Sequence, residues 1–151
     1  MRMAYLNEEE QARRPLDAAE LGAVGVVYRH LGTDPGAYEP ALAALCAERG
    51  YVARDEVKLA KDTPNLDALL GKFIGEHLHT DDEVRFVLQG EGIFDIRSTD
   101  DRWMRVVVEA GDLLVVPKNL YHRFLLTDAQ QIRCVRLFQD QSGWVPHYRP
   151  A

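Results

Sequence analysis

The chain has 151 residues, about the size of one domain, and its 46% hydrophobic and 28% charged residues are typical of a globular protein. A formal net charge of −6 without a basic stripe argues against a nucleic-acid partner. No apolar run approaches the ~20 residues of a membrane span, and the N-terminal residues lack the apolar core of a secretory signal, so we expect a cytoplasmic protein without a membrane partner.

The first 72 residues carry the signals of three short helices and two strands. The first helix has Asp17 as its N-cap and Glu20 three residues later, which is the pattern of a capping box. The second has Pro40 in its first turn and ends at Gly50, and the third begins at Thr63. The expected helices span residues 16–25, 39–50 and 63–73, and the expected strands span residues 4–6 and 26–31.

From about residue 73 onward, short runs with strand composition alternate with Gly, Asp and Asn. Seven such runs without an intervening helix favour an antiparallel sandwich or barrel. They span residues 73–79, 83–89, 92–98, 103–109, 113–117, 121–127 and 132–139. We predict a single mostly β domain over residues 1–151, with a helix-containing N-terminal part (1–72), a barrel core (73–140) and a C-terminal tail (141–151).

The segment GEHLHTDDEVRF concentrates the residues that carry chemistry. His77 and His79 are two positions apart, so in a strand they project from the same face, and Glu83 and Arg85 share a face of the next strand. The intervening residues have turn composition, and we expect the two strands to form a hairpin that places Glu83 beside the histidines. A bare His-x-His pair is weak evidence, but the glutamate four residues later strengthens the interpretation as a metal site.

A second segment is expected to complete this site. His122 follows a Pro-Lys-Asn turn and opens another predicted strand, and three imidazoles with one carboxylate suit iron, nickel, cobalt, manganese or zinc. On a six-coordinate ion, four protein ligands leave two neighbouring positions for two oxygens of one substrate. We interpret Asp81 and Asp82 as solvated turn residues, and His30 and His147 as ordinary surface or half-buried residues.

The spacing of these residues resembles the two motifs of the cupin family. That resemblance implies a small double-stranded β-barrel, or jelly roll, with a metal inside it. Asn119 stands where the second motif commonly has Gly, and Leu126 where it commonly has Asn; an Asn tolerates left-handed backbone, so the first departure is mild. The residues that carry the resemblance are Gly71, His77, His79, Glu83 and Gly90 in the first motif, and Gly111, Pro117 and His122 in the second.

Within the cupins, the segments EHLHTDDEVRFVLQGEGIFDI, RWMRVVVEAGDLLVVPKNLYHRF and RCVRLF resemble acireductone dioxygenases, and the similarity extends over about residues 16–149. The resemblance implies one Fe(II) or Ni(II) per chain, an anionic substrate bound by arginines, and an aromatic pocket for the thioether tail of that substrate. Arg105 and Arg123 alternate out of register with these positions and are expected at the surface. The implied metal ligands are His77, His79, Glu83 and His122, the implied catalytic residues are Arg85 and Arg136, and the implied pocket residues are Phe73, Phe124 and Trp144.

The implied reaction is cleavage of the acireductone 1,2-dihydroxy-3-keto-5-methylthiopentene by O₂ in methionine salvage. In this family the iron form gives 2-keto-4-methylthiobutyrate and formate, whereas the nickel form gives methylthiopropionate, formate and carbon monoxide. The ligands are the same in both forms, so the sequence leaves the metal and the products open.

Two other functions stay open, because cupins host many activities on one fold. The first is another metal-dependent cupin enzyme, either a different dioxygenase or a sugar isomerase, although a sugar site should have a more polar pocket than three aromatic residues provide. The second is a non-enzymatic cupin that binds a small ligand, although a sensor of that kind would normally carry a DNA-binding segment and no basic helix-turn-helix pattern is present. We expect a monomer whose partners are the substrate and O₂.

Overall fold

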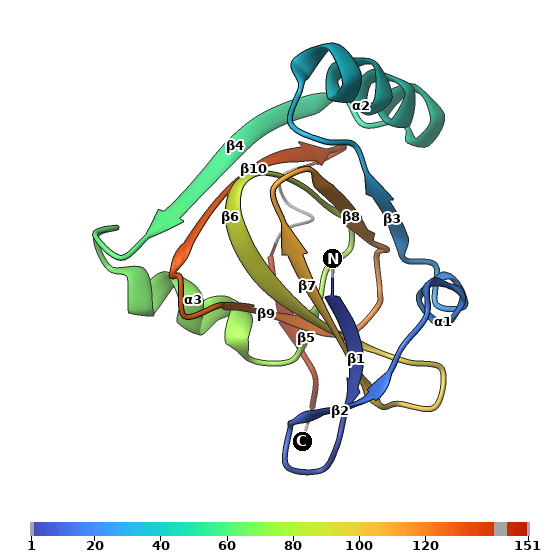
Figure 1. Ribbon diagram of the computed structural model, residues 1–151, viewed down its shortest axis with the longest axis vertical. Coiled ribbons are helices and arrows are strands. Elements are labelled where there is room, and N and C mark those ends of the chain that lie inside the picture. Colours follow the sequence, from blue (N-terminus) through green and yellow to red (C-terminus); the bar gives the residue numbers. More distant parts are fainter. Residues whose placement is uncertain (1, 141–144, 151) are drawn as a thin grey trace.

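Two antiparallel sheets that share one long strand form the barrel seen in the computed structural model, which describes residues 2–140 and 145–150 (Figure 1). The predicted fold, a mostly β jelly roll with a few helices, is confirmed. The helices are α1 (Ala18–Gly22), α2 (Pro35–Arg49) and α3 (Leu66–Ile74). The strands are β1 (Arg2–Leu6), β2 (Ala12–Pro15), β3 (Val27–His30), β4 (Ala53–Ala60), β5 (His77–Leu78), β6 (Glu83–Arg97), β7 (Trp103–Glu109), β8 (Asp112–Val116), β9 (His122–Leu126), β10 (Gln131–Phe138) and β11 (His147–Tyr148).

The shared strand is β6, which was predicted as two separate strands and is one continuous strand of 15 residues. Its first half pairs with β8 and β10, and its second half pairs with β7 and β9. One sheet therefore has the order β4-β10-β6-β8-β3, and the other has the order β11-β5-β9-β6-β7-β1-β2. Figure 1 shows β6 as a long arc that bends from one sheet into the other.

The bend in β6 depends on a glycine. Gly90 has a φ of +78°, and a Cβ atom at this position would lie 2.1 Å from the carbonyl oxygen of Gln131 on β10. Only a glycine combines this left-handed backbone with so close an approach of a neighbouring strand. The sequence interpretation ended one strand just before Gly90 and began another after it, whereas in the structure the strand bends at Gly90 and continues.

The helices begin where local capping is best. The predicted capping box of α1, between Asp17 and Glu20, is present. The predicted start of α2 at residue 39, with Pro40 in the first turn, is wrong: Asp34 caps the helix by accepting from the amide of Gly36, Pro35 occupies the first turn, and Pro40 lies inside the helix.

The predicted start of α3 is also displaced. The hydroxyl of Thr63 accepts from the amide of Ala60 in the preceding turn, so it does not cap α3. The helix begins instead after Asn65, which has a left-handed φ of +58°. None of the helices in the described part of the chain has the length and apolarity that crossing a membrane requires.

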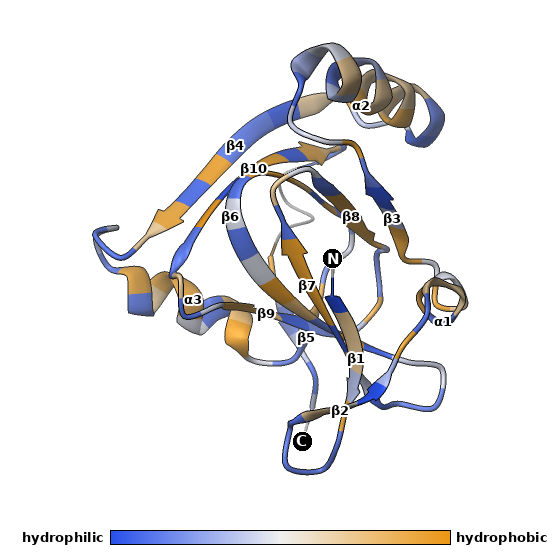
Figure 2. Ribbon diagram, in the orientation of Figure 1, coloured by the Kyte–Doolittle hydropathy of each residue, from blue (hydrophilic) through white to orange (hydrophobic). Residues whose placement is uncertain are grey.

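The strands around the histidines differ most from the prediction. Residues 73–74 end α3, and β5 consists of His77 and Leu78 alone. The expected hairpin with the next strand is wrong, because β5 pairs with β9 and β11. Strands β2, β4 and β11 were not predicted. Exposed and half-buried residues alternate along most of β4, and its hydropathy alternates in the second half, where Figure 2 shows orange and blue bands, so that half was a usable signal.

The sheet that contains β8 is covered on both faces. Its outer face packs against α2, through Tyr38, Leu42 and Leu45. Its inner face belongs to the core of the barrel, to which Leu114, Val116 and other residues contribute. Burial on both faces explains why all five residues of β8 are buried and why its sequence lacks the polar alternation of a half-exposed strand.

The role of Gly90 predicts a large effect of a small substitution. Gly90→Ala should lower the free energy of unfolding by about 1–3 kcal/mol, because the added methyl meets backbone at a left-handed position. Gly71→Ala in α3 is the matched control, since no atom lies within 4 Å of its added Cβ and its φ is not left-handed; it should be stabilising by about 0.5–1 kcal/mol. Urea unfolding followed by circular dichroism measures both, and equal stability of the two variants would contradict this account.

Candidate metal centre

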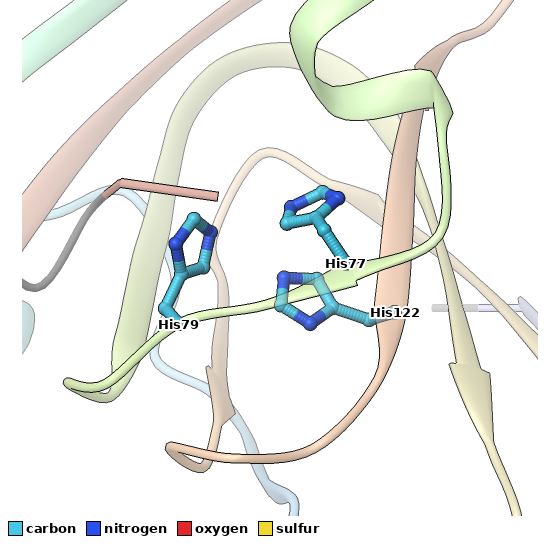
Figure 3. A group of neighbouring side chains, drawn as sticks. All are labelled: His77, His79 and His122. Carbon is cyan, nitrogen blue, oxygen red and sulfur yellow. The ribbon is translucent and has the colours of Figure 1, made fainter. Parts of the chain in front are cut away.

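Three imidazole rings converge inside the barrel, as Figure 3 shows. His77, His79 and His122 are 1%, 3% and 1% exposed, and one nitrogen from each lies within 4.8 Å of the nitrogens of the other two. His77 on β5 is directly opposite His122 on β9 in the ladder between these strands. The predicted convergence is therefore observed, but it arises from the pairing of β5 with β9 and not from a hairpin with β6.

Glu83 supplies a carboxylate to the same place. It opens β6 opposite Val116 of β8, and it is 6% exposed. Its Oε2 atom lies 3.1 Å from Nε2 of His122, and its Oε1 atom lies 3.5 Å from Nε2 of His79. The four residues expected as ligands thus face one another, although they come from three different strands and the loop after β5.

The backbone fixes which nitrogen each ring presents. A carbonyl oxygen only accepts hydrogen bonds, so an imidazole nitrogen beside it carries the hydrogen and the other nitrogen keeps its lone pair. All three rings place Nδ1 against a carbonyl and turn Nε2 toward the centre, which is the arrangement found around metal-bound histidines. The distances from Nδ1 are 2.7 Å to Gly75 for His77, 3.3 Å to Val145 for His79 and 2.8 Å to Leu120 for His122.

The atoms that point into the centre lack hydrogen-bond partners. Among the described residues, the Nε2 atoms of the three histidines and Oε2 of Glu83 are buried without one. Leaving such an atom unsatisfied costs about 1–3 kcal/mol, and four together would be a heavy burden on a small domain. A divalent cation would satisfy all four at once, and three nitrogens with one oxygen suit iron, nickel, cobalt, manganese or zinc. The residues therefore fit a metal ion.

Burial and charge shift the pKa values of these groups in different directions. Burial lowers the pKa of His77 to about 4, against a smaller opposing effect of its contact with Gly75, so its ring is neutral at neutral pH. Burial alone would raise the pKa of Glu83, but the positive charges of Arg85 and His122 outweigh it and hold that pKa well below its usual range. Burial alone would lower the pKa of His122, but the Glu83 carboxylate outweighs it and the pKa of His122 is raised.

A pocket opens beside the four candidate ligands. Five of the expected site residues line it, namely Phe73 from α3, Glu83 and Arg85 from β6, Phe124 from β9 and Arg136 from β10. The remaining expected pocket residue, Trp144, lies outside the described residues. Residues that the sequence interpretation did not name complete the wall: Val57, Leu59, Phe94, Ile132 and Cys134.

The wall formed by β4 and β10 changes from charged to apolar along its length. Three directly opposed pairs lie along it, and all of their residues except Asp55 line the pocket; the polar pair lies at one end and the most apolar at the other. The pairs are Asp55 with Arg136, Val57 with Cys134, and Leu59 with Ile132. Cys134 and Ile132 share the face of Arg136 on β10 by strand alternation, so they could have been predicted from the sequence. Val57 and Leu59 could be predicted only once β4 was recognised as a strand.

The two expected arginines each contact a carboxylate. Arg85 donates to Oε1 of Glu83 at 3.1 Å and to the carbonyl of Val84 at 2.9 Å. Arg136 donates from Nε and from a terminal nitrogen to the two carboxylate oxygens of Asp55, each at 2.7 Å. Arg85 and Arg136 are directly opposite each other in the pairing of β6 with β10. The expected anionic partner of an inward arginine is thus supplied for Arg136 by the protein itself.

The interpretation of Asp81 and Asp82 as solvated turn residues is wrong. Asp81 is 8% exposed, and its Oδ2 atom accepts from the amides of Gln139 and Asp140 at 3.0 and 3.3 Å. Asp82 accepts from the hydroxyl of Tyr51 at 2.7 Å and from the amide of Lys118 at 2.9 Å. These carboxylates fasten the loop between His79 and Glu83 to distant parts of the chain.

The expectation that Arg105 and Arg123 lie on the surface is also wrong. Their side chains are 23% and 13% exposed, and both donate to Asp95, which is fully buried. The interpretation of the other two histidines is confirmed: the His30 side chain is 59% exposed, with Nδ1 2.9 Å from Asp112, and His147 is exposed on β11.

Comparisons with known proteins agree with this site. The sequence profile of the ARD/ARD′ family matches residues 4–146. The acireductone dioxygenase of Heterostelium pallidum is 47% identical over 136 residues, which cover 90% of this chain and 92% of that protein. The one from Dictyostelium discoideum is 48% identical over 121 residues, covering 80% and 82% of the two chains. An acireductone dioxygenase structure from Bacillus anthracis, with a cadmium ion in its active centre, is 35% identical and covers 98% of each chain with a TM-score of 0.84.

The centre predicts a loss of metal binding without a loss of fold. His122→Ala should weaken binding of a divalent cation by roughly 100-fold or more, because a lost ligand exceeds the 10–100-fold effect of losing a group that only orients one. The control is His147→Gln on the exposed strand β11, which should bind the ion as the unaltered protein does. Metal content after anaerobic dialysis measures both, and an unchanged content in His122→Ala would exclude this centre.

Proposed function

The chain belongs to the ARD/ARD′ family, and from that premise we propose that it is an acireductone dioxygenase that cleaves 1,2-dihydroxy-3-keto-5-methylthiopentene with O₂. One observation carries the proposal. Four buried ligand atoms lack hydrogen-bond partners, and Glu83, which carries one of them, lines a pocket with Arg85 and Arg136, in which the Leu59–Ile132 pair lies further along β4 and β10 from Arg136. A substrate with an anionic head and an apolar tail matches that division.

The charges around the pocket support an anionic head. The carboxylates of Glu83 and Asp55 balance the guanidinium groups of Arg85 and Arg136, so these four residues together are neutral. A divalent ion would bring the total to +2, which complements the dianion of an ene-diol. When bound, the metal supplies a Lewis acid and a template for two substrate oxygens. Arg85 and Arg136 hold the negative charge of the head in place beside it.

The apolar part of the pocket fits a thioether tail. Phe73 and Phe124 line it, as does the opposed pair of Leu59 and Ile132 at the end away from the arginines. These side chains exclude water and give the tail a single direction, so the head is left beside the four ligands. We assign Trp144 to the same pocket on the resemblance alone.

The two alternative functions have less support. A sugar isomerase needs hydrogen-bonding side chains along a polyhydroxylated substrate, but in the described part of the chain the charged or strongly polar side chains that line the pocket are Glu83, Arg85 and Arg136. A non-enzymatic binding module has no use for ligand atoms prepared for a redox-capable ion, and measurement of oxygen uptake separates it from an enzyme. We propose that the protein acts as a cytoplasmic monomer in methionine salvage, which mass determination in solution and a salvage-dependent growth assay test.

The choice between Fe(II) and Ni(II) is tested by reconstitution. The metal-free protein is loaded anaerobically with either ion, mixed with an acireductone and exposed to O₂. We expect the iron form to give the keto acid and formate, and the nickel form to give methylthiopropionate, formate and carbon monoxide. Oxygen uptake, formate and carbon monoxide are measured together. No oxygen uptake above the uncatalysed rate with either ion would overturn the proposed function.

The role given to Arg136 predicts a defect in turnover alone. Arg136→Ala should lower kcat/KM by at least ~30-fold, which corresponds to the ~2 kcal/mol lower limit for removing one partner of a buried charge pair. Its metal content should not change, because Arg136 is held by Asp55, which is not one of the four candidate ligands. Arg133→Ala on the same strand is the control, since Arg133 pairs with Glu56 outside the pocket. An unchanged rate in Arg136→Ala would refute the assignment.

A further inference from the structure

We propose that Asp55 is a positioning residue of the substrate pocket, which holds the guanidinium group of Arg136 against the pocket wall in the orientation that binds the anionic head. The inference rests on the proposed function for its chemistry, but the geometry that motivates it is independent of the substrate. Asp55 lies on β4, a strand that the motifs around the histidines do not include.

Asp55 and Arg136 form an ion pair with two hydrogen bonds. Asp55 and Arg136 are directly opposite each other in the ladder of β4 and β10. Both carboxylate oxygens accept from the arginine at 2.7 Å, one from Nε and one from a terminal nitrogen. Two parallel hydrogen bonds to a planar guanidinium set its plane as well as its distance, which a single bond or a lysine would not do.

The neighbourhood of Arg136 explains why such a clamp is needed. On its other side Arg136 is directly opposite Arg85, and like charges facing each other across two strands repel. Arg85 has Glu83 as its carboxylate, and Arg136 has Asp55, so each positive charge has its own counter-charge. Without Asp55, Arg136 would lose the two hydrogen bonds that set the plane of its guanidinium group and the counter-charge that offsets repulsion by Arg85.

A second ion pair on the same two strands shows what is particular to the first. Arg133 and Glu56 lie 3.1 Å apart, with side chains 39% and 44% exposed. Arg136 and Asp55 are less exposed, at 23% and 34%, and Arg136 lines the pocket whereas Arg133 does not. The outer pair also joins an arginine of β10 to a carboxylate of β4, although Glu56 is directly opposite Val135, so it provides a control for the charge of an ion pair between these strands.

The first test measures the position of Arg136 without any substrate. In the metal-free protein labelled with ¹⁵N, exchange of the Arg136 Nε hydrogen with solvent should accelerate roughly tenfold or more in Asp55→Asn, because the charged acceptor that protects it is lost. Glu56→Gln should leave this exchange unchanged. Equal exchange in the unaltered protein and in Asp55→Asn would overturn the proposal, whether or not the protein is an acireductone dioxygenase.

The second test measures the consequence for turnover. In the metal-loaded enzyme, Asp55→Ala should lower kcat/KM by about 10–100-fold, the range for a misplaced binding group, with metal content and unfolding midpoint measured alongside. The double variant Asp55→Ala/Arg136→Ala should be no slower than Arg136→Ala, because Asp55 acts through Arg136. Asp55→Glu should recover part of the rate, and Glu56→Ala should stay within about twofold of the unaltered enzyme.

The outcomes separate the two proposals. Additive effects of Asp55→Ala and Arg136→Ala, or equal losses in Asp55→Ala and Glu56→Ala, would show that Asp55 is merely structural and would overturn the positioning role. If the unaltered protein fails to turn over an acireductone with either ion, the proposed function fails, and the exchange of the Arg136 hydrogen still decides whether Asp55 positions that residue.

Discussion

The structure is organised around four buried ligand atoms that the protein does not satisfy. The Nε2 atoms of three histidines and Oε2 of Glu83 are buried together in the barrel without hydrogen bonds, although they are among the groups for which burial is most expensive. Other parts of the chain keep this arrangement from relaxing. Backbone carbonyls hold Nδ1 of each ring, the pairing of β5 with β9 sets His77 against His122, and the carboxylates of Asp81 and Asp82 fasten the intervening loop. Such preorganisation has a purpose only if an ion supplies the missing contacts.

Strand β6 connects this centre to the rest of the fold. Glu83 and Arg85 lie at its start, in the sheet that α2 covers. Asp95 lies near its end, in the other sheet, where its carboxylate accepts hydrogen bonds from Arg105 and Arg123. The bend at Gly90 lets one strand belong to both sheets, so the position of the carboxylate ligand depends on the packing of the whole barrel. The packing of strands that contact neither the four ligands nor the pocket therefore helps to hold Glu83 in place.

The sequence predicted the chemistry of the site better than the route by which the chain forms it. His77, His79 and Glu83 are close in sequence, so their proximity survives an error in strand pairing, and the predicted hairpin proved wrong while its ligands converged. The β4 wall was missed because Asp55 contacts Arg136 across 81 positions, and no local pattern encodes such a pairing. The prediction for Asp81 was wrong for the same reason. The local sequence indicates a turn, but the amides that donate to Asp81 belong to residues 139 and 140, which directly follow β10.

The two arginines of the pocket differ in what holds them, and this suggests a division of labour. Arg85 contacts Glu83, which is also a candidate ligand, so a bound ion would share the charge of that carboxylate and weaken its hold on Arg85. Arg136 contacts Asp55, which lies outside the ligand group and keeps its full charge for the arginine. On the proposed function, Arg85 can therefore adjust to the substrate when an ion is bound. Arg136 keeps its position and orients the anionic head. A pocket with one adjustable and one fixed cation binds a dianion in a single orientation at less cost than a pocket with two mobile ones, because only one side chain loses its freedom on binding.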